Sequence, residues 1–232
     1  MNPLILALDT DDLEIACAWI SATNDSIATY KAGLEFFLKF GSTGIEKLRT
    51  VGDFDLFLDL KLHDIPNTVA GATASIRSVD PKFLTVHASG GADMINAAAL
   101  AAPDIDITAV TILTSLNDVQ LQEIGYARSA GESAIELADL AIKAGARAIV
   151  SSPLEVAGIR DRIGSTPAII TPGVRPTGSA VGDQRRIMTP QEAMRAGSTY
   201  LVIGRPITSL YKDGVQAMRD RAREILDDAT SA

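Results

Sequence analysis

The sequence predicts one domain, a (β/α)8 barrel that spans residues 1–232. Eight short apolar runs are each followed by a stretch with helical spacing or by a helix start. The runs are apolar without alternation, which is typical of parallel strands packed under helices. No G-x-G-x-x-G fingerprint follows the first run, and eight units in 232 residues favour a closed barrel over an open doubly wound sheet.

The strand and helix units can be assigned in order from the amino terminus. LILALD at 4–9 leads into the helical pattern DDLEIACAWI, and DLFLDLKLHD at 55–64 leads into IPNTVAGATASI. FLTVHA at 83–88 leads through a Gly-Gly turn into ADMINAAALAA. The eight strands are expected to begin near Leu4, Ile27, Asp55, Phe83, Asp106, Ala148, Ala168 and Tyr200.

Two segments, 114–131 and 173–189, are too long to be simple connections. The second contains glycines, prolines and arginines but has no hydrophobic period with which it could bury itself. We therefore predict that 173–189 is a mobile active-site loop, and Arg175 and Gln184 within it make phosphate the group on which it would close.

The charge balance bears on the possible partners. The 21 Lys and Arg residues face 29 Asp and Glu residues, and the net charge of -8 disfavours a broad surface for nucleic acid or anionic membranes. No apolar run approaches the roughly 18 residues of a membrane span, and no leader pattern precedes the first run. We expect a cytoplasmic protein. Cys17 is the only cysteine and lies on an apolar helical pattern, so we interpret it as a buried structural thiol.

Polar residues gather where the expected strands end. In a barrel the active site lies at the carboxyl ends of the strands, so these side chains are candidates for chemistry. They are Asp9, Lys31, Asp59, Lys61, Thr114, Arg175 and Arg205.

The motif DLKLHD at 59–64 carries the strongest signal. A period of two residues puts Asp59 and Lys61 on the same side of the strand, and Asp64 follows in the turn. Lys31 on the neighbouring strand would complete a charge-balanced network of two carboxylates and two ammonium groups. A structural ion network at the barrel rim is the alternative, but four charges at adjoining strand ends favour a functional site.

A phosphate site is predicted beside the last strand. Gly204 lets a ligand approach the backbone, and Arg205 supplies hydrogen-bond donors at a helix start. Gln184 and Arg175 belong to the long loop nearby, where barrels commonly hold phosphate. Arg185 and Arg186 in the same loop are also explained as solvated surface arginines.

Other reactive residues support no chemistry of their own. His63 and His87 are the only histidines, and no Asp or Glu lies at a spacing that would complete a metal site with them, so structural roles are favoured. Ser151 and Ser152 lack the G-x-S-x-G context of a nucleophile elbow. We therefore predict no metal site.

The sequence resembles the orotidine 5'-phosphate decarboxylase family over nearly its whole length. DLKLHDIPNT at 59–68 looks like the signature of that family. Six further motifs occur along the chain in the order expected for the family: LALD, YKAG, ILTSL, TPGVRP, GDQRR and GSTYLVIGRPIT. The resemblance implies a cofactor-free enzyme that converts orotidine 5'-phosphate to UMP. The substrate-binding residues that it implies are Asp9, Lys31, Asp59, Lys61, Asp64, Ile65, Pro66, Asn67, Thr68, Thr114, Arg175, Gln184, Gly204 and Arg205.

The resemblance also assigns roles. Lys61 is the implied proton donor, and Asp59, Lys31 and Asp64 complete the catalytic set. A homodimer is implied, in which Asp64 and Thr68 reach into the partner's site. Loss of CO2 from C6 of orotate leaves electrons in an orbital orthogonal to the ring π system, so fixed charges must stabilise the carbanion.

Two alternatives remain open at this point. A magnesium-dependent sugar-phosphate decarboxylase or aldolase of the same superfamily also carries an Asp-x-Lys-x-x-Asp strand, but would be expected to place a metal-binding carboxylate near the end of the second strand, where this chain has Lys31. A non-catalytic phosphate-binding barrel would keep Gly204 and Arg205 but lose part of the charged group. The complete set of charges opposes this second alternative.

Overall fold

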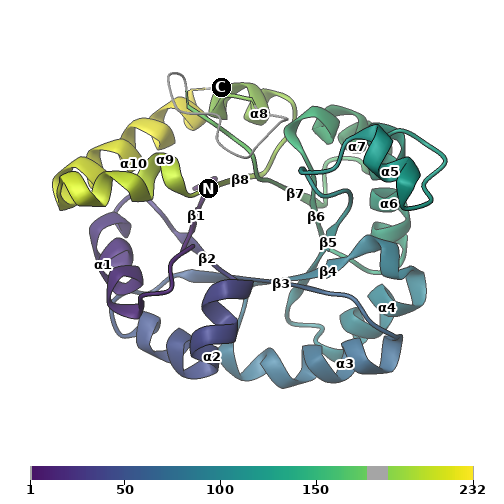
Figure 1. Cartoon of the computed structure of the whole chain (residues 1–232), viewed down its shortest axis with the longest axis horizontal. Helices are drawn as coiled ribbons and strands as arrows, with labels where there is room; N and C mark the ends of the chain where they lie inside the picture. Colours follow the sequence, from purple (N-terminus) through teal and green to yellow (C-terminus); the bar gives the residue numbers. More distant parts are fainter. Residues whose placement is uncertain (1, 177–187, 232) are drawn as a thin grey trace.

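The computed structural model describes residues 2–176 and 188–231. Eight parallel strands close into a barrel in sequence order, with the helices outside it (Figure 1). The strands are β1 (Leu4–Ala7), β2 (Thr29–Gly33), β3 (Asp55–Leu62), β4 (Phe83–His87), β5 (Asp106–Val110), β6 (Ala148–Val150), β7 (Ala168–Thr171) and β8 (Tyr200–Ile203). The predicted fold class is confirmed.

The predicted strand starts agree with the structure at seven of the eight strands. The exception is β2, which begins at Thr29, two residues after the predicted start at Ile27. The Ile27 amide donates to the Thr23 carbonyl at 2.9 Å, so this residue still belongs to the turn that ends the preceding helix.

The helices alternate with the strands and cover the outer face of the barrel. The α-helices are α1 (Leu13–Thr23), α2 (Leu34–Arg49), α3 (Pro66–Ser75), α4 (Ala92–Ala101), α5 (Asp118–Glu123), α6 (Ala130–Lys143), α7 (Val156–Ile163), α8 (Pro190–Arg195), α9 (Arg205–Thr208) and α10 (Val215–Thr230). Short 3-10 helices are η1 (Ile76–Val79), η2 (Ala88–Gly90), η3 (Pro153–Glu155) and η4 (Ser209–Asp213). Local caps stabilise several starts: the Asp12 carboxylate accepts the amides of Glu14 and Ile15 at the start of α1.

The two long segments differ from simple loops. Segment 114–131 contains α5, whose start is stabilised by a capping box between Asn117 and Gln120. In segment 173–189, Val174 and Met188 form an isolated β-bridge that holds the two ends of the segment together. Residues 177–187 lie outside the described residues, so the predicted mobility of this loop stays a prediction.

Apolar side chains fill the barrel as well as its outer layer. Inside the barrel, the Phe83 ring packs edge to face against Phe57 and Tyr200, with ring centroids 5.8 and 5.4 Å apart. Ile5, Ala148 and Ile170 complete this inner cluster, and the larger cluster lies between the strands and the helices. Cys17 is buried, as predicted. The inner cluster closes the interior below the carboxyl ends of the strands, where the polar residues are.

No helix within residues 2–176 and 188–231 combines the length and the apolar character that crossing a bilayer requires.

Candidate active site

The carboxyl end of β3 departs from a regular strand at Lys61. This lysine has a φ of 50°, in the left-handed region, and the pairing of β3 with β4 shifts register between Leu58 and Leu62. The backbone at Lys61 is therefore irregular, a feature that the period of two residues did not predict. The predicted outcome is nonetheless present: the Lys61 Nζ donates to Asp59 Oδ1 at 2.7 Å.

Asp59 lies between two ammonium groups. Its Oδ2 is 3.4 Å from Lys31 Nζ on the adjacent strand, and Lys31 Nζ also donates to Asp9 Oδ1 at 3.1 Å. Gly33 leaves the space for this lysine, since a Cβ there would lie 3.0 Å from Lys31 Nζ. The four charged groups alternate in sign along the row Asp9, Lys31, Asp59 and Lys61.

Burial and charge oppose one another in this row. Burial raises the pKa of Asp59, but Lys31 and Lys61 outweigh it and hold the pKa of this carboxyl below its usual value. Burial lowers the pKa of Lys31, while the charges of Asp59 and Asp9 outweigh it and hold that pKa above its usual value. Both groups are therefore ionised at neutral pH, so the site carries fixed charges of both signs.

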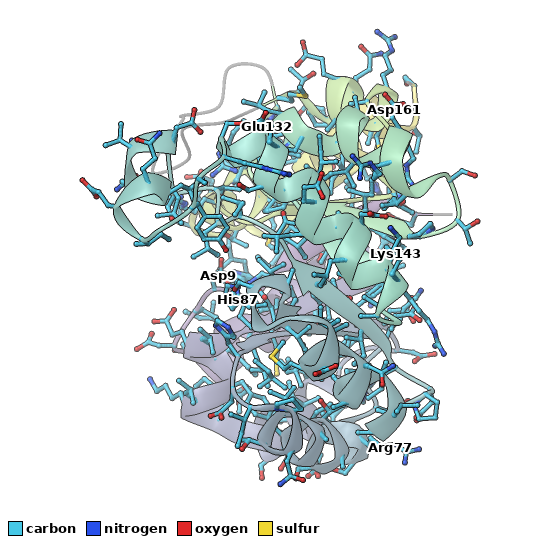
Figure 2. All side chains as sticks on the ribbon, turned by 90° about the vertical axis from the view of Figure 1, so that its right-hand side faces the viewer. Asp9, Arg77, His87, Glu132, Lys143 and Asp161 are labelled. Atoms are coloured by element: carbon cyan, nitrogen blue, oxygen red, sulfur yellow. The ribbon has the colours of Figure 1, made fainter. Side chains whose placement is uncertain are left out.

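A cavity of about 300 Å³ opens above this row of charges at the carboxyl ends of the strands. Its charged wall is formed by Asp9, Lys31, Asp59 and Lys61, and its apolar wall includes Val110, Ile112, Val150 and Val202. Thr114, Arg175, Gly204 and Arg205 also line the cavity. In Figure 2, Asp9 and His87 lie toward one end of the barrel, whereas Arg77 and Lys143 lie toward the other.

The side of the cavity next to β8 can receive an anion. Arg205 is the first residue of α9, and Gly204 precedes it with its Cα close to the first strand: a Cβ there would lie 3.5 Å from Ala7 Cβ. On the facing loop, the Arg175 amide donates to the Met188 carbonyl at 2.9 Å, next to the β-bridge. Two arginines and a glycine therefore line the same cavity, as expected for a phosphate site.

One part of the predicted site lies apart from the cavity in the single chain. The Asp64 side chain is exposed, and its Oδ1 accepts the amide of Ile65 at 2.7 Å. The next residues form the exposed start of α3, and Ile65 is 66% exposed. These residues, from Asp64 to Thr68, do not line the cavity within the described chain. Gln184, Arg185 and Arg186 lie outside the described residues.

Sequence reasoning missed two kinds of site residue. The apolar wall comes from strand positions that resemble core positions in the sequence, so no local signal separates them. Thr85 on β4 was missed too: its hydroxyl contacts both Asp59 and the Lys61 backbone. Thr85 lies within the apolar run FLTVHA, adjacent to neither a charged residue nor a predicted turn, so no feature of the sequence indicated this role.

The two histidines lie together beside the site. The rings of His63 and His87 are 5.3 Å apart between centroids. Burial, followed by the neighbouring His63 and Lys61, lowers the pKa of His87. Within the described ranges, no three His, Cys, Asp or Glu side chains are grouped so that they could hold a metal ion.

The fold and the cavity define a class of protein. It is a (β/α)8-barrel enzyme whose cavity is lined by a row of alternating charges and by two arginines. A family model described as "Orotidine 5'-phosphate decarboxylase / HUMPS family" matches residues 2–220, and the chain belongs to this family. The family resemblance inferred from the sequence is confirmed.

Individual relatives agree over nearly the full length. A protein of Thermobifida fusca (strain YX) named orotidine 5'-phosphate decarboxylase is 50% identical over 215 residues, covering 93% of this chain and 92% of the relative. A protein of the same name from Frankia casuarinae is 46% identical, with 93% and 85% covered. The crystal structure of orotidine 5'-phosphate decarboxylase from Lactobacillus acidophilus superposes with a TM-score of 0.85 at 33% identity, covering 99% of both chains.

Proposed function

We propose that the chain is a carboxy-lyase that converts orotidine 5'-phosphate to UMP and CO2 in pyrimidine nucleotide synthesis. Family membership and the names of the relatives support this activity. The single observation that carries the mechanism is the contact of Lys61 Nζ with Asp59 Oδ1, 2.7 Å apart at the wall of the cavity.

Lys61 performs the proton transfer in this mechanism. The bond between C6 and the carboxylate breaks, CO2 leaves, and the electron pair stays on C6 in the plane of the ring. No ring resonance can receive this pair, so a nearby positive charge must stabilise it. The Lys61 ammonium supplies the charge and then donates one proton to C6, which gives UMP.

Asp59 has two effects in the same step. Its ionised carboxylate accepts a hydrogen bond from Lys61 and thereby orients the ammonium toward the substrate. When the substrate carboxylate lies beside Asp59, the two negative charges repel one another, and the repulsion is relieved as neutral CO2 leaves. Lys31, 3.4 Å from the other oxygen, keeps Asp59 ionised.

The remaining residues bind the nucleotide. We assign the phosphate to Arg175, Gln184, Gly204 and Arg205, and the rest of the nucleotide to residues that include Asp9 and Thr114. Binding of a phosphate that does not react can be used to order the site and exclude water. Closure of segment 173–189 over the phosphate stays a prediction, as does the cytoplasmic location.

A homodimer would explain the exposed segment that follows β3. Asp64, Ile65, Pro66, Asn67 and Thr68 are all exposed in the single chain, and none of them lines the cavity. Exposed Leu38 on α2, at 80%, and Leu100 on α4, at 75%, add apolar surface on helices that flank this region in sequence. We propose that Asp64 and Thr68 reach the substrate in the site of a second copy.

The sugar-phosphate alternative differs at the end of β2. That activity would be expected to use a metal-binding carboxylate there, whereas β2 presents Lys31, which pairs with Asp9 and Asp59. A decisive experiment adds orotidine 5'-phosphate to purified protein treated with EDTA and follows UMP formation. We expect turnover without added metal; well-folded protein that forms no UMP, or forms it only with magnesium, would contradict the proposal.

A further inference from the structure

Thr85 on β4 joins two groups of the active site through one hydroxyl. Its side chain is fully buried, and its Oγ1 accepts the Lys61 amide at 2.8 Å. The same Oγ1 lies 3.0 Å from Asp59 Oδ1. An ionised carboxylate only accepts hydrogen bonds, so the Thr85 hydroxyl proton must point to Asp59 while an oxygen lone pair receives the amide.

The hydrogen bonds form a closed circuit. The Lys61 amide donates to Thr85 Oγ1, the Thr85 hydroxyl donates to Asp59 Oδ1, and the Lys61 ammonium donates to the same Oδ1 at 2.7 Å. The position of Lys61 relative to Asp59 Oδ1 is thus fixed twice: its ammonium bonds this oxygen directly, and its backbone amide is linked to it through the Thr85 hydroxyl. Thr85 is the member of the circuit that comes from a different strand.

The backbone of Lys61 explains why such support is required. A φ of 50° is unfavourable for a residue with a side chain, and it persists only where surrounding contacts hold it. The register of β3 and β4 is interrupted at this point, between Leu58 and Leu62. The Thr85 hydroxyl provides the turned amide of Lys61 with an acceptor at this interruption.

We propose that Thr85 is a positioning residue for the decarboxylation. It holds the left-handed turn at Lys61 and fixes the Asp59 oxygen, so that the ammonium points at the reacting carbon. The inference rests on the proposed function, because the proposed reaction supplies the kinetic measurement. It adds a residue that does not line the cavity but sets the geometry of two groups that do.

Two substitutions separate the hydroxyl from the shape of the side chain. Thr85→Val keeps the volume and removes both hydrogen bonds, whereas Thr85→Ser keeps the hydroxyl and removes a methyl group. Thr108→Val is the matched control, because Thr108 pairs with Thr85 in the register of β4 and β5 and is also fully buried. The hydroxyl of Thr108 donates to the Asp106 carbonyl at 2.9 Å and contacts neither Asp59 nor Lys61 among the described contacts.

The kinetic test measures kcat for orotidine 5'-phosphate and the Kd for UMP with the wild type and all three variants. For Thr85→Val we expect kcat to fall about 10- to 100-fold, the effect of losing a hydrogen bond to a charged group in the transition state. The Kd for UMP should change less than about threefold, because uniform binding is retained. Thr85→Ser should recover most of the rate, and Thr108→Val should match the wild type.

A second measurement is independent of turnover. Hydrogen exchange of the Lys61 amide, followed by NMR, should be at least about tenfold faster in Thr85→Val than in the wild type, and close to the wild type in Thr85→Ser. A wild type without decarboxylase activity would reject the proposed function, while the exchange measurement would still test the contact. An active wild type with unchanged kcat in Thr85→Val, or equal damage in Thr85→Val and Thr85→Ser, would overturn the positioning role.

Discussion

The Lys61 ammonium lies 2.7 Å from Asp59 Oδ1, two positions earlier on the same strand, and the strand turns left-handed at Lys61 itself. Regular β geometry would carry both side chains perpendicular to the sheet and parallel to one another. The turn at Lys61 instead brings the ammonium onto the carboxylate. Four predictions concern this contact, the cavity around it and the exposed Asp64.

The first prediction concerns Lys61. Lys61→Ala should lower kcat by at least about 100-fold, because general acid catalysis typically contributes 10²- to 10⁴-fold and the stabilising charge is lost as well. The Kd for UMP, measured by calorimetry, should change far less than kcat. Lys39→Ala is the control, since Lys39 pairs with Asp11 outside the cavity and should be dispensable. A near-normal rate in Lys61→Ala would refute the role of proton donor.

The second prediction concerns Arg205, which is proposed to bind the phosphate. Arg205→Ala should reduce kcat/KM for orotidine 5'-phosphate by about 100-fold or more, but should hardly affect the slow reaction of orotidine, which lacks the phosphate. Arg223→Ala, which removes a surface ion pair with Asp25, serves as a control for charge. Equal losses on the two substrates would point to general damage instead of a lost phosphate contact.

The third prediction tests the proposal that Asp64 of one subunit reaches the active site of the other. Lys61→Ala and Asp64→Ala proteins should each be nearly inactive, but a heterodimer of the two has one site with both substitutions and one site with neither. Random exchange makes about half of the dimers heterodimers, so the mixture should regain roughly a quarter of wild-type activity. Native mass spectrometry must show that exchange took place. Exchange without regained activity would place Asp64 in its own chain's site.

The fourth prediction follows from the lowered pKa of Asp59. A carboxyl whose pKa is lower in the folded protein stabilises the fold above its unfolded pKa of about 3.9, and this stability is lost as the pH falls through the folded pKa. As the pH falls below about 4, the unfolding free energy of the wild type should therefore decrease relative to that of Asp59→Asn. Urea unfolding across pH measures it, and a constant difference would contradict the lowered pKa.

Sequence patterns determined the architecture because they depend on local properties. Buried strands must be apolar throughout, and the starts of seven of the eight strands could be predicted from this requirement alone. The order of the strands follows from their alternation with helices. The position of the charged residues at the strand ends, together with the motif at 59–68, also identified the family without any coordinates.

Tertiary structure alone decided how the charges meet. Nothing in the local sequence gives Lys61 a left-handed backbone; Thr85, 24 residues further along the chain, supports it from the next strand. Asp9 pairs with Lys31 in the single chain, whereas Asp64, predicted to belong to the charge network, is exposed and accepts the amide of Ile65. Contacts between distant residues depend on register and on packing between strands, which the periodicity of one strand does not contain.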